Sequence, residues 1–342
     1  MIKMDGKICF FIGSYYENTR ILAGKVCAGQ SALYANEYCA DFDIDSISYM
    51  VTTPDAYLLG CIEKSCYQGQ PGGAIAAFRI TEEGLALTDC VRGLGSGSCH
   101  VCYTPHHRWI FVSNYGDGSI DMLRLSENGK LTKLKHIRRL GGGPLTEQYG
   151  PHAHCSLAPD NEETLFVCDL GTDQIGKYSL PDMKLTDNIQ FPGGTGPRHA
   201  VFSKDESVLY VACELGNDVF VMHTDGSVLQ HFNLQIDKNV FTAVSSVRLT
   251  EDYSHLVVGI RGDNKIAIFP IQKGNNLLGK PVVILTEEKY PWDIVPLTKD
   301  ASILLTAFEQ SDCVQLLQIS ATGKVQILGE MKAVHPTCIC LK

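Results

Sequence analysis

A strand–turn–strand pattern recurs seven times along the chain, and this repetition restricts the fold more than any other feature of the sequence. Each copy has a short apolar run, a polar turn and a second run rich in β-branched and aromatic residues. One apolar residue can be aligned in every copy: Phe10, Leu58, Ile110, Leu165, Leu209, Leu256 and Leu304. Successive aligned residues are 44 to 55 positions apart, with a mean of about 49, which is the period of a propeller blade.

The repeat predicts an all-β fold, a seven-bladed β-propeller with about four antiparallel strands per blade, rather than a β-sandwich or a β-helix. Strand-like runs upstream of several aligned residues, such as residues 199–207, supply the additional strands. The run at 8–16 lacks a preceding strand, and the run at 335–342 lacks a following one. Together the N- and C-terminal strands would complete one blade and close the ring, which removes an exposed sheet edge. Residues 1–342 are then expected to form a single propeller domain.

Composition narrows the class of partner. Hydrophobic residues make up 44% and charged residues 20% of the 342 residues, which is typical of a globular protein. No apolar run approaches the roughly 18 residues of a membrane helix, and no signal peptide is recognisable. A net charge of −9 without a basic run argues against binding to nucleic acid or to an anionic membrane. We expect a cytoplasmic protein whose arginines can still attract a small anion, and the oligomeric state is not indicated.

The 14 cysteines do not form a metal or disulfide pattern. Cys99 and Cys102 make the only CxxC, and no second pair completes a zinc site. Other cysteines lie inside apolar runs, as Cys168 does, where a reduced thiol behaves as a small hydrophobe. His152 and His154 share the spacing of two metal ligands on one strand face, but a third ligand is missing. We therefore predict free thiols, no metal and no organic cofactor.

Candidate functional residues follow from the repeat, because equivalent positions of different blades converge on the propeller axis. Five residues after the aligned positions the chain carries Glu63, Tyr115, Glu214, Arg261 and Glu309. Eleven residues before them it carries Cys99, His154 and Arg198, which would begin innermost strands. His100 follows Cys99 and could also line the channel. We predict substrate-binding positions at His100, Glu63, Tyr115 and Glu309.

His154, Arg198, Glu214 and Arg261 are the candidate catalytic residues, because three adjacent repeats would bring them to one channel mouth. A histidine and a carboxylate can exchange protons near neutral pH. Two arginines can hold a carboxylate or phosphate and stabilise a developing oxyanion. The structural alternative is a salt bridge between Arg198 and Glu214 that packs adjacent blades, with His154 as a satisfied residue at a strand end.

At these residues the chain resembles the lactonase family of seven-bladed β-propellers, which includes propeller-type 6-phosphogluconolactonases and fungal 3-carboxy-cis,cis-muconate lactonizing enzymes. The resemblance covers nearly the whole chain and is weaker in residues 20–75. The segments that carry it are residues 99–120, 150–180, 194–222, 257–269 and 336–342. It implies a channel site with one histidine, two arginines and one glutamate. The matching positions are His154, Arg198, Glu214 and Arg261.

Two features qualify the match. The family spacing to Asp169 is preserved from His154, so the resemblance favours His154 over His152. Residues 290–294 read YPWDI, and Trp292 stands where the family often has an arginine. This departure removes a possible channel cation and leaves the exact substrate open.

The resemblance implies hydrolysis of a sugar lactone, with 6-phosphogluconolactone as the first candidate substrate. Water would attack the carbonyl with His154 or Glu214 as general base, while Arg198 and Arg261 bind the anionic group and the oxyanion. A lactonizing cycloisomerase that acts on a muconate-like diacid is the second possibility. A non-catalytic propeller that binds a sugar or a protein is the third.

Overall fold

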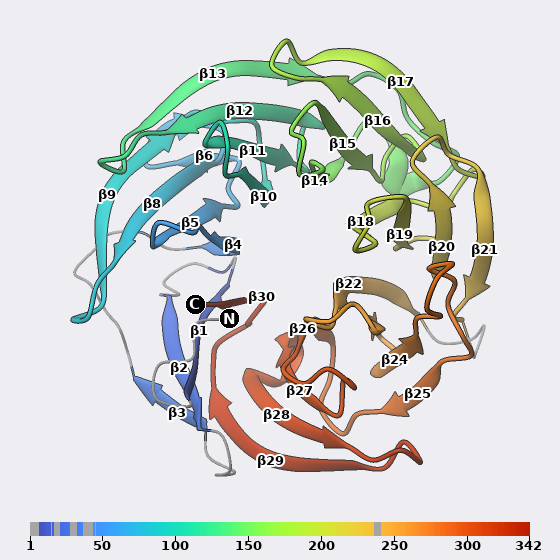
Figure 1. Ribbon diagram of the computed structural model, residues 1–342. Coiled ribbons are helices and arrows are strands. Elements are labelled where there is room, and N and C mark those ends of the chain that lie inside the picture. Colours follow the sequence, from blue (N-terminus) through green and yellow to red (C-terminus); the bar gives the residue numbers. More distant parts are fainter. Residues whose placement is uncertain are drawn as a thin grey trace. The chain divides into compact units, whose positions relative to one another are not determined.

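The computed structural model describes residues 7–14, 16, 21–27, 33–36, 44, 46–235 and 241–342, with the backbone alone at residues 7, 27 and 33–36. Regular structure in these residues is β-strand, apart from two 3₁₀ helices, η1 (Thr146–Gln148) and η2 (Glu309–Ser311). The strands form seven four-stranded sheets and one two-stranded hairpin. Figure 1 shows the strands of each sheet lying side by side. The all-β class and the count of seven blades agree with the sequence prediction.

The chain divides into two compact units, and one of them includes Pro197–Ile339. This first unit contains three sheets in which each strand pairs antiparallel with the next along the chain. Their strands are β18 (Pro197–Phe202), β19 (Val208–Cys213), β20 (Asp218–His223) and β21 (Val228–Asn233); β22 (Ala243–Leu249), β23 (His255–Arg261), β24 (Lys265–Pro270) and β25 (Val282–Leu285); and β26 (Pro291–Pro296), β27 (Ile303–Phe308), β28 (Cys313–Ile319) and β29 (Val325–Lys332).

The second unit includes Asn36–Gly196 and contains three sheets of the same design. Their strands are β4 (Ile47–Thr52), β5 (Tyr57–Ile62), β8 (Ala74–Ile80) and β9 (Leu85–Arg92); β10 (Ser98–Thr104), β11 (Trp109–Asn114), β12 (Ser119–Leu125) and β13 (Leu131–Arg138); and β14 (Ala153–Leu157), β15 (Thr164–Asp169), β16 (Gln174–Ser179) and β17 (Lys184–Gln190). The hairpin of β6 (Cys66–Tyr67) and β7 (Gln70–Pro71) lies between β5 and β8 in the sequence. That the whole chain is one domain stays a prediction.

The remaining sheet combines the two ends of the chain. Its strand order is β3-β2-β1-β30, and its strands are β1 (Lys7–Gly13), β2 (Leu22–Cys27), β3 (Leu33–Asn36) and β30 (Cys338–Leu341). Cys338 and Ile339 are buried, and the Ile339 amide donates a hydrogen bond to Asp293 Oδ2 at 2.9 Å. The prediction that the N- and C-terminal strands complete one blade is confirmed.

Each aligned apolar residue lies in the strand next to the first or last strand of its sheet in the strand order, and the described residues of these strands are mostly buried because both strand faces pack. In the second unit, Ile110 and Val112 of β11 join a core with residues of β5 and β8. Phe111, between them, joins a different core with residues of β15 and β16. Neighbouring residues of a strand point to opposite faces, so a strand that packs on both sides reads as a continuous apolar run.

Candidate active site

The first strand of six sheets carries a β-bulge near its start, where the strand has one residue more than the facing stretch of the neighbouring strand. In five of these sheets the extra residue is Ser48, Cys99, His154, Arg198 or Trp292, and in β22 the shift covers Ser245 and Ser246. A bulge re-aims a side chain relative to the regular alternation of the strand, and bulges are common beside active sites. The repeat spacing selected Cys99, His154 and Arg198 without indicating this backbone device.

Arg198, Glu214 and Arg261 meet in the first unit and are called the arginine–glutamate cluster below. Arg198 is the bulge residue of β18, Glu214 follows β19, and Arg261 ends β23. Glu214 Oε2 lies 2.7 Å from Arg198 Nε and 2.7 Å from Arg261 Nη2. The two arginine side chains are 4% and 7% exposed and Glu214 is 21% exposed, so all three charges are largely removed from solvent.

The ion pair between Arg198 and Glu214 is the contact that the structural alternative expects. It lies within one sheet, however, because β18 and β19 are neighbouring strands. The pair between Glu214 and Arg261 joins this sheet to the next one along the chain. Two guanidinium groups share one carboxylate, which leaves one formal positive charge in excess. Such a partly desolvated excess charge is a binding determinant for an anion.

The electrostatics of the cluster define what Glu214 can do. Burial raises the pKa of Glu214, but the charges of Arg261 and Arg198 outweigh burial and hold this pKa below its ordinary value. The carboxylate therefore stays ionised at neutral pH. A carboxylate whose pKa is lowered is a weak proton acceptor, so its position suits it to orient the two arginines rather than to deprotonate water.

Two aromatic residues flank the arginines. The Trp292 ring centroid lies 4.4 Å from Arg261 Cζ and 5.8 Å from Arg198 Cζ, which is the range of cation–π contacts. The Tyr290 ring centroid lies 5.8 Å from Arg261 Cζ. Trp292 thus replaces a possible cation with a surface on which the existing cations stack. The sequence analysis missed Tyr290, although YPW at 290–292 aligns with GPR at 196–198.

Glu309 also lies in the first unit, where it begins η2 and is buried. Its Oε1 lies 2.9 Å from His335 Nδ1. The carboxylate is thus engaged by an imidazole, and its role in substrate binding stays a prediction.

His154 belongs to the second unit, so its approach to the arginine–glutamate cluster stays a prediction. It is the bulge residue of β14, it is 8% exposed, and its ring meets the edge of Tyr115 with centroids 5.7 Å apart. Tyr115 stacks on His152 at 4.4 Å, and His152 Nδ1 lies 2.6 Å from the Tyr115 carbonyl oxygen. Because the carbonyl can only accept, His152 carries its proton on Nδ1. Tyr115 and His152 therefore hold each other in place, and the Tyr115 ring packs against His154.

His100 and Glu63 lie in the same unit. His100 is buried in β10, where its Nδ1 accepts a hydrogen bond from the Ser156 amide at 3.4 Å. Its Nε2 is 3.5 Å from Cys155 Sγ, and its ring lies 4.2 Å from that of Tyr49. Glu63 follows β5, and its amide donates to the Ser46 carbonyl at 3.1 Å. His100 is thus held by protein groups, and a substrate contact at either residue stays a prediction.

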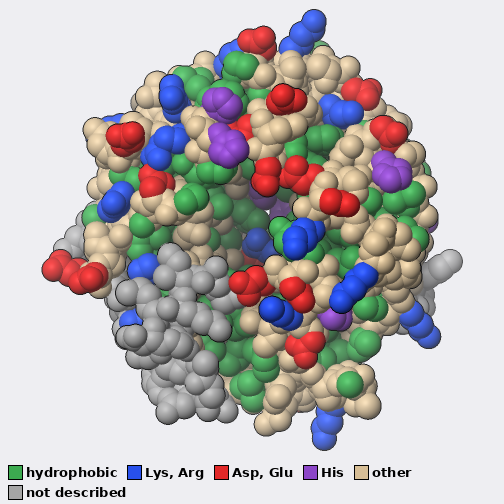
Figure 2. Space-filling view, in the orientation of Figure 1, with side chains coloured by type: hydrophobic (Ala, Val, Ile, Leu, Met, Phe, Trp, Pro, Cys, Tyr) green, Lys and Arg blue, Asp and Glu red, His purple; other side chains and the backbone are tan. Residues whose placement is uncertain are grey.

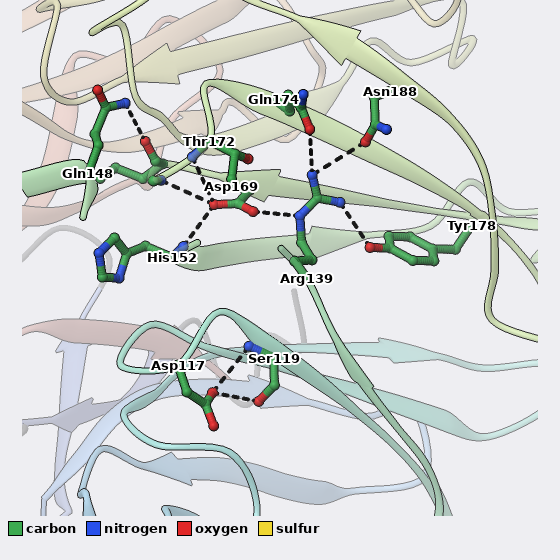
Figure 3. Close-up of polar contacts among 12 residues, drawn as sticks. Asp117, Ser119, Arg139, Gln148, His152, Asp169, Thr172, Gln174, Tyr178 and Asn188 are labelled. Atoms are coloured by element: carbon green, nitrogen blue, oxygen red, sulfur yellow. Dashed lines mark hydrogen bonds and ion pairs between the residues drawn. The ribbon is translucent and has the colours of Figure 1, made fainter. Parts of the chain in front are cut away.

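A buried ion pair that the sequence analysis missed supports the strand that carries His154. Arg139 Nε lies 2.5 Å from Asp169 Oδ2, and its other nitrogens donate to Tyr178, Gln174 and Asn188. Asp169 Oδ1 accepts the amide of His152 at 2.8 Å (Figure 3). This carboxylate therefore fixes the backbone two residues before His154. The pairing joins residues far apart in the sequence and leaves no local signal.

The structure adds little on metals and thiols. In the described ranges, no group of three or more His, Cys, Asp or Glu side chains is placed to hold a metal ion. The twelve cysteines whose side chains are described are free thiols. Figure 2 shows acidic and basic side chains interspersed over the face in view. The absence of metal, cofactor and disulfides from the protein stays a prediction.

Comparison with known proteins identifies the class. A family model described as "Lactonase, 7-bladed beta-propeller" matches residues 10–341. The chain belongs to this family, and the predicted fold class is confirmed.

Individual relatives are distant. The 6-phosphogluconolactonase of Bacillus subtilis (strain 168) is 27% identical over 304 residues, which cover 85% of this chain and 86% of that protein. An uncharacterized protein of Staphylococcus aureus (strain bovine RF122 / ET3-1) is 28% identical over 301 residues, covering 84% and 85%. The periplasmic gluconolactonase PpgL of Pseudomonas aeruginosa has a TM-score of 0.89 at 21% identity, with 98% and 99% coverage. At that identity the likeness shows the fold alone. No helix of the described chain is long and apolar enough to span a membrane, and the cytoplasmic location stays a prediction.

Proposed function

We propose that the protein hydrolyses a sugar lactone that carries an anionic group, with 6-phosphogluconolactone as the first candidate substrate. The observation that carries this proposal is the arginine–glutamate cluster, in which two buried guanidinium groups share one carboxylate. Membership of the lactonase family and the relative named 6-phosphogluconolactonase support the reaction class.

In this proposal His154 transfers the proton, and the two arginines bind the substrate and stabilise the charge that develops on it. A water molecule adds to the lactone carbonyl carbon while His154 accepts its proton, since an imidazole exchanges protons near neutral pH. Arg198 and Arg261 stabilise the negative charge that develops on the carbonyl oxygen and hold the anionic substituent. The bond between the carbonyl carbon and the ring oxygen then breaks, and His154 returns the proton to the leaving alkoxide. The products are the open-chain acid and no other species.

The lowered pKa of Glu214 favours His154 as the base. Its carboxylate is held by two ion pairs and has little affinity for a proton at neutral pH. We therefore assign the proton transfer to His154, and we assign to Glu214 the orientation of the two arginines.

The test is hydrolysis of 6-phosphogluconolactone, generated in the assay and corrected for spontaneous hydrolysis. Arg198→Ala and Arg261→Ala should each lower kcat/KM by about a hundredfold or more, the usual effect of losing one oxyanion donor. Arg124→Ala is the matched control, because Arg124 is an exposed residue of β12. Wild-type turnover no faster than the spontaneous reaction, or full activity of both arginine variants, would contradict the proposal.

A further inference from the structure

Tyr290 has a backbone conformation that tyrosine seldom adopts. Its φ is 65°, in the left-handed region, and Pro291 follows it. Bulky residues are rare in this region. The equivalent position, two residues before the bulge, is Gly97, Gly196 or Ser46 in three other sheets, with φ of 69°, 63° and 57°. His152, at the equivalent position before His154, is not left-handed, so the position admits other conformations. Where it is left-handed, glycine is the unstrained choice.

Neighbouring groups hold Tyr290 in this conformation. Its amide donates to Asn264 Oδ1 at 2.9 Å, and its carbonyl accepts the amide of Glu309 at 3.1 Å. Asn264 lies in the turn that follows Arg261. The backbone of Tyr290 is thus tied to the segment that carries one of the two site arginines. Strain that is retained in this way is concentrated at functional sites.

The side chain of Tyr290 lies against the arginine–glutamate cluster. Its ring centroid is 5.8 Å from Arg261 Cζ and 6.3 Å from the Trp292 ring. Its hydroxyl makes no hydrogen bond to the described part of the chain, although the residue is half-buried. The buried tyrosines of the sheets differ in this respect. Tyr57 and Tyr210, for example, donate to carbonyl oxygens at 2.9 and 2.8 Å.

The charge environment keeps the phenol protonated. Burial raises the pKa of Tyr290, and this effect together with Glu214 and Glu309 outweighs the opposing charge of Arg261. Across the neutral range the hydroxyl is therefore a donor rather than a phenolate.

We propose that Tyr290 is a specificity-determining residue, whose hydroxyl donates a hydrogen bond to a hydroxyl or carboxyl oxygen of a sugar-derived acid or lactone bound at Arg261. This inference rests on the proposed function for the identity of the ligand. The ring alone could also serve to cover Arg261 through a cation–π contact. The experiment must therefore separate the hydroxyl from the ring.

Tyr290→Phe keeps the ring and removes the hydroxyl. Its kcat/KM for 6-phosphogluconolactone should fall about tenfold or more, chiefly through KM, because a binding contact to the substrate is lost. Its Tm should equal that of the wild type. Tyr253→Phe is the matched control: Tyr253 is also left-handed, with φ of 60°, but lies exposed in the turn after β22. Wild-type kinetics of Tyr290→Phe would overturn the proposal.

Tyr290→Gly tests the strain. Glycine adopts the left-handed conformation freely, so Tm should stay at or above the wild-type value while kcat/KM falls at least as far as in Tyr290→Phe. A clear decrease in Tm, larger than that of Tyr253→Gly, would show that Tyr290 is retained for stability and would contradict the inference.

Calorimetric titration with 6-phosphogluconate separates this inference from the proposed function. If the wild type binds this acid without hydrolysing the lactone, and Tyr290→Phe binds it about tenfold more weakly, the inference holds and the hydrolytic function fails. If the lactone is hydrolysed equally by both proteins, the function holds and the inference fails. If the wild type neither binds nor hydrolyses, both are overturned.

Discussion

Glu214→Gln tests whether Glu214 orients the two arginines of the arginine–glutamate cluster or acts as the general base. The substitution keeps the shape of the side chain and removes the charge that pairs with Arg198 and Arg261 at 2.7 Å each. If Glu214 only orients the arginines, kcat/KM should fall by up to about a hundredfold, as expected for catalytic groups displaced by about 1 Å. The acidic limb of the pH profile of kcat/KM should persist, because the proposal assigns the proton transfer to His154 and not to Glu214.

Glu214→Gln should also lower the free energy of unfolding, and this loss can be measured independently of activity. A hydrogen bond to a charged group contributes about 1.5–3 kcal/mol, and Glu214 makes two of them. The glutamine side-chain carbonyl can keep one of these two hydrogen bonds, and the partial exposure of Glu214 weakens both of them. We therefore expect the free energy of unfolding to fall by about 2 kcal/mol. At about 2 °C per kcal/mol for a large domain, Tm at neutral pH should fall by about 4 °C. Glu251→Gln, at an exposed turn residue, is the matched control.

The pH dependence of this loss follows from the sign of the shift. The folded-state pKa of Glu214 lies below its ordinary value, so its contribution to stability is present above the ordinary carboxyl pKa. The contribution disappears as the pH falls through the lower folded value, and the two proteins should then converge in Tm. Two results would refute the reasoning. Loss of the acidic limb in Glu214→Gln would make Glu214 the general base, and a difference in Tm that persists at low pH would show that the ion pairs are not its source.

The remaining predictions concern the scaffold. Deletion of residues 338–342 removes β30, whose side chains at Cys338 and Ile339 are buried, so thermal denaturation should show gross destabilisation rather than local fraying. An unchanged Tm would contradict the role of this strand. Arg139→Ala leaves Asp169 buried without its guanidinium partner, which should destabilise the protein by about 3–5 kcal/mol in chemical denaturation. A loss below about 1 kcal/mol would mean that the backbone amides alone satisfy Asp169.

The repeat made the blade count and the terminal closure accessible from sequence, because a period of about 49 residues survives substitution of individual side chains. The same arithmetic selected Glu214 and Arg261 at one repeat position and Arg198 at another, and the structure brings these three together. The repeat spacing could not show whether a polar residue expected to line the channel already makes a hydrogen bond within the protein. The amide of Ser156 on the ring of His100 is such a contact, formed between residues more than 50 positions apart.

Backbone geometry was the other limit of the sequence analysis. A β-bulge adds one residue to a strand without a characteristic residue type, so the repeat spacing did not indicate it. Left-handed φ values are easily inferred where glycine occurs, as at Gly196, and are hidden where Tyr290 takes the same conformation. Tyr290 therefore escaped a search that was based on the regular repeat positions.

The bulge explains how one scaffold can carry different chemistry at equivalent positions. In five sheets the extra residue is a serine, a cysteine, a histidine, an arginine or a tryptophan, while the backbone device stays the same. Because the residue lies outside the regular register of the strand pair, substituting it changes no regular pair of the ladder. Its side chain can therefore vary at little cost to the sheet. A substitution such as arginine to tryptophan at position 292 then alters the charge beside Arg198 and Arg261 without altering the blade, and substrate choice can change while the fold is retained.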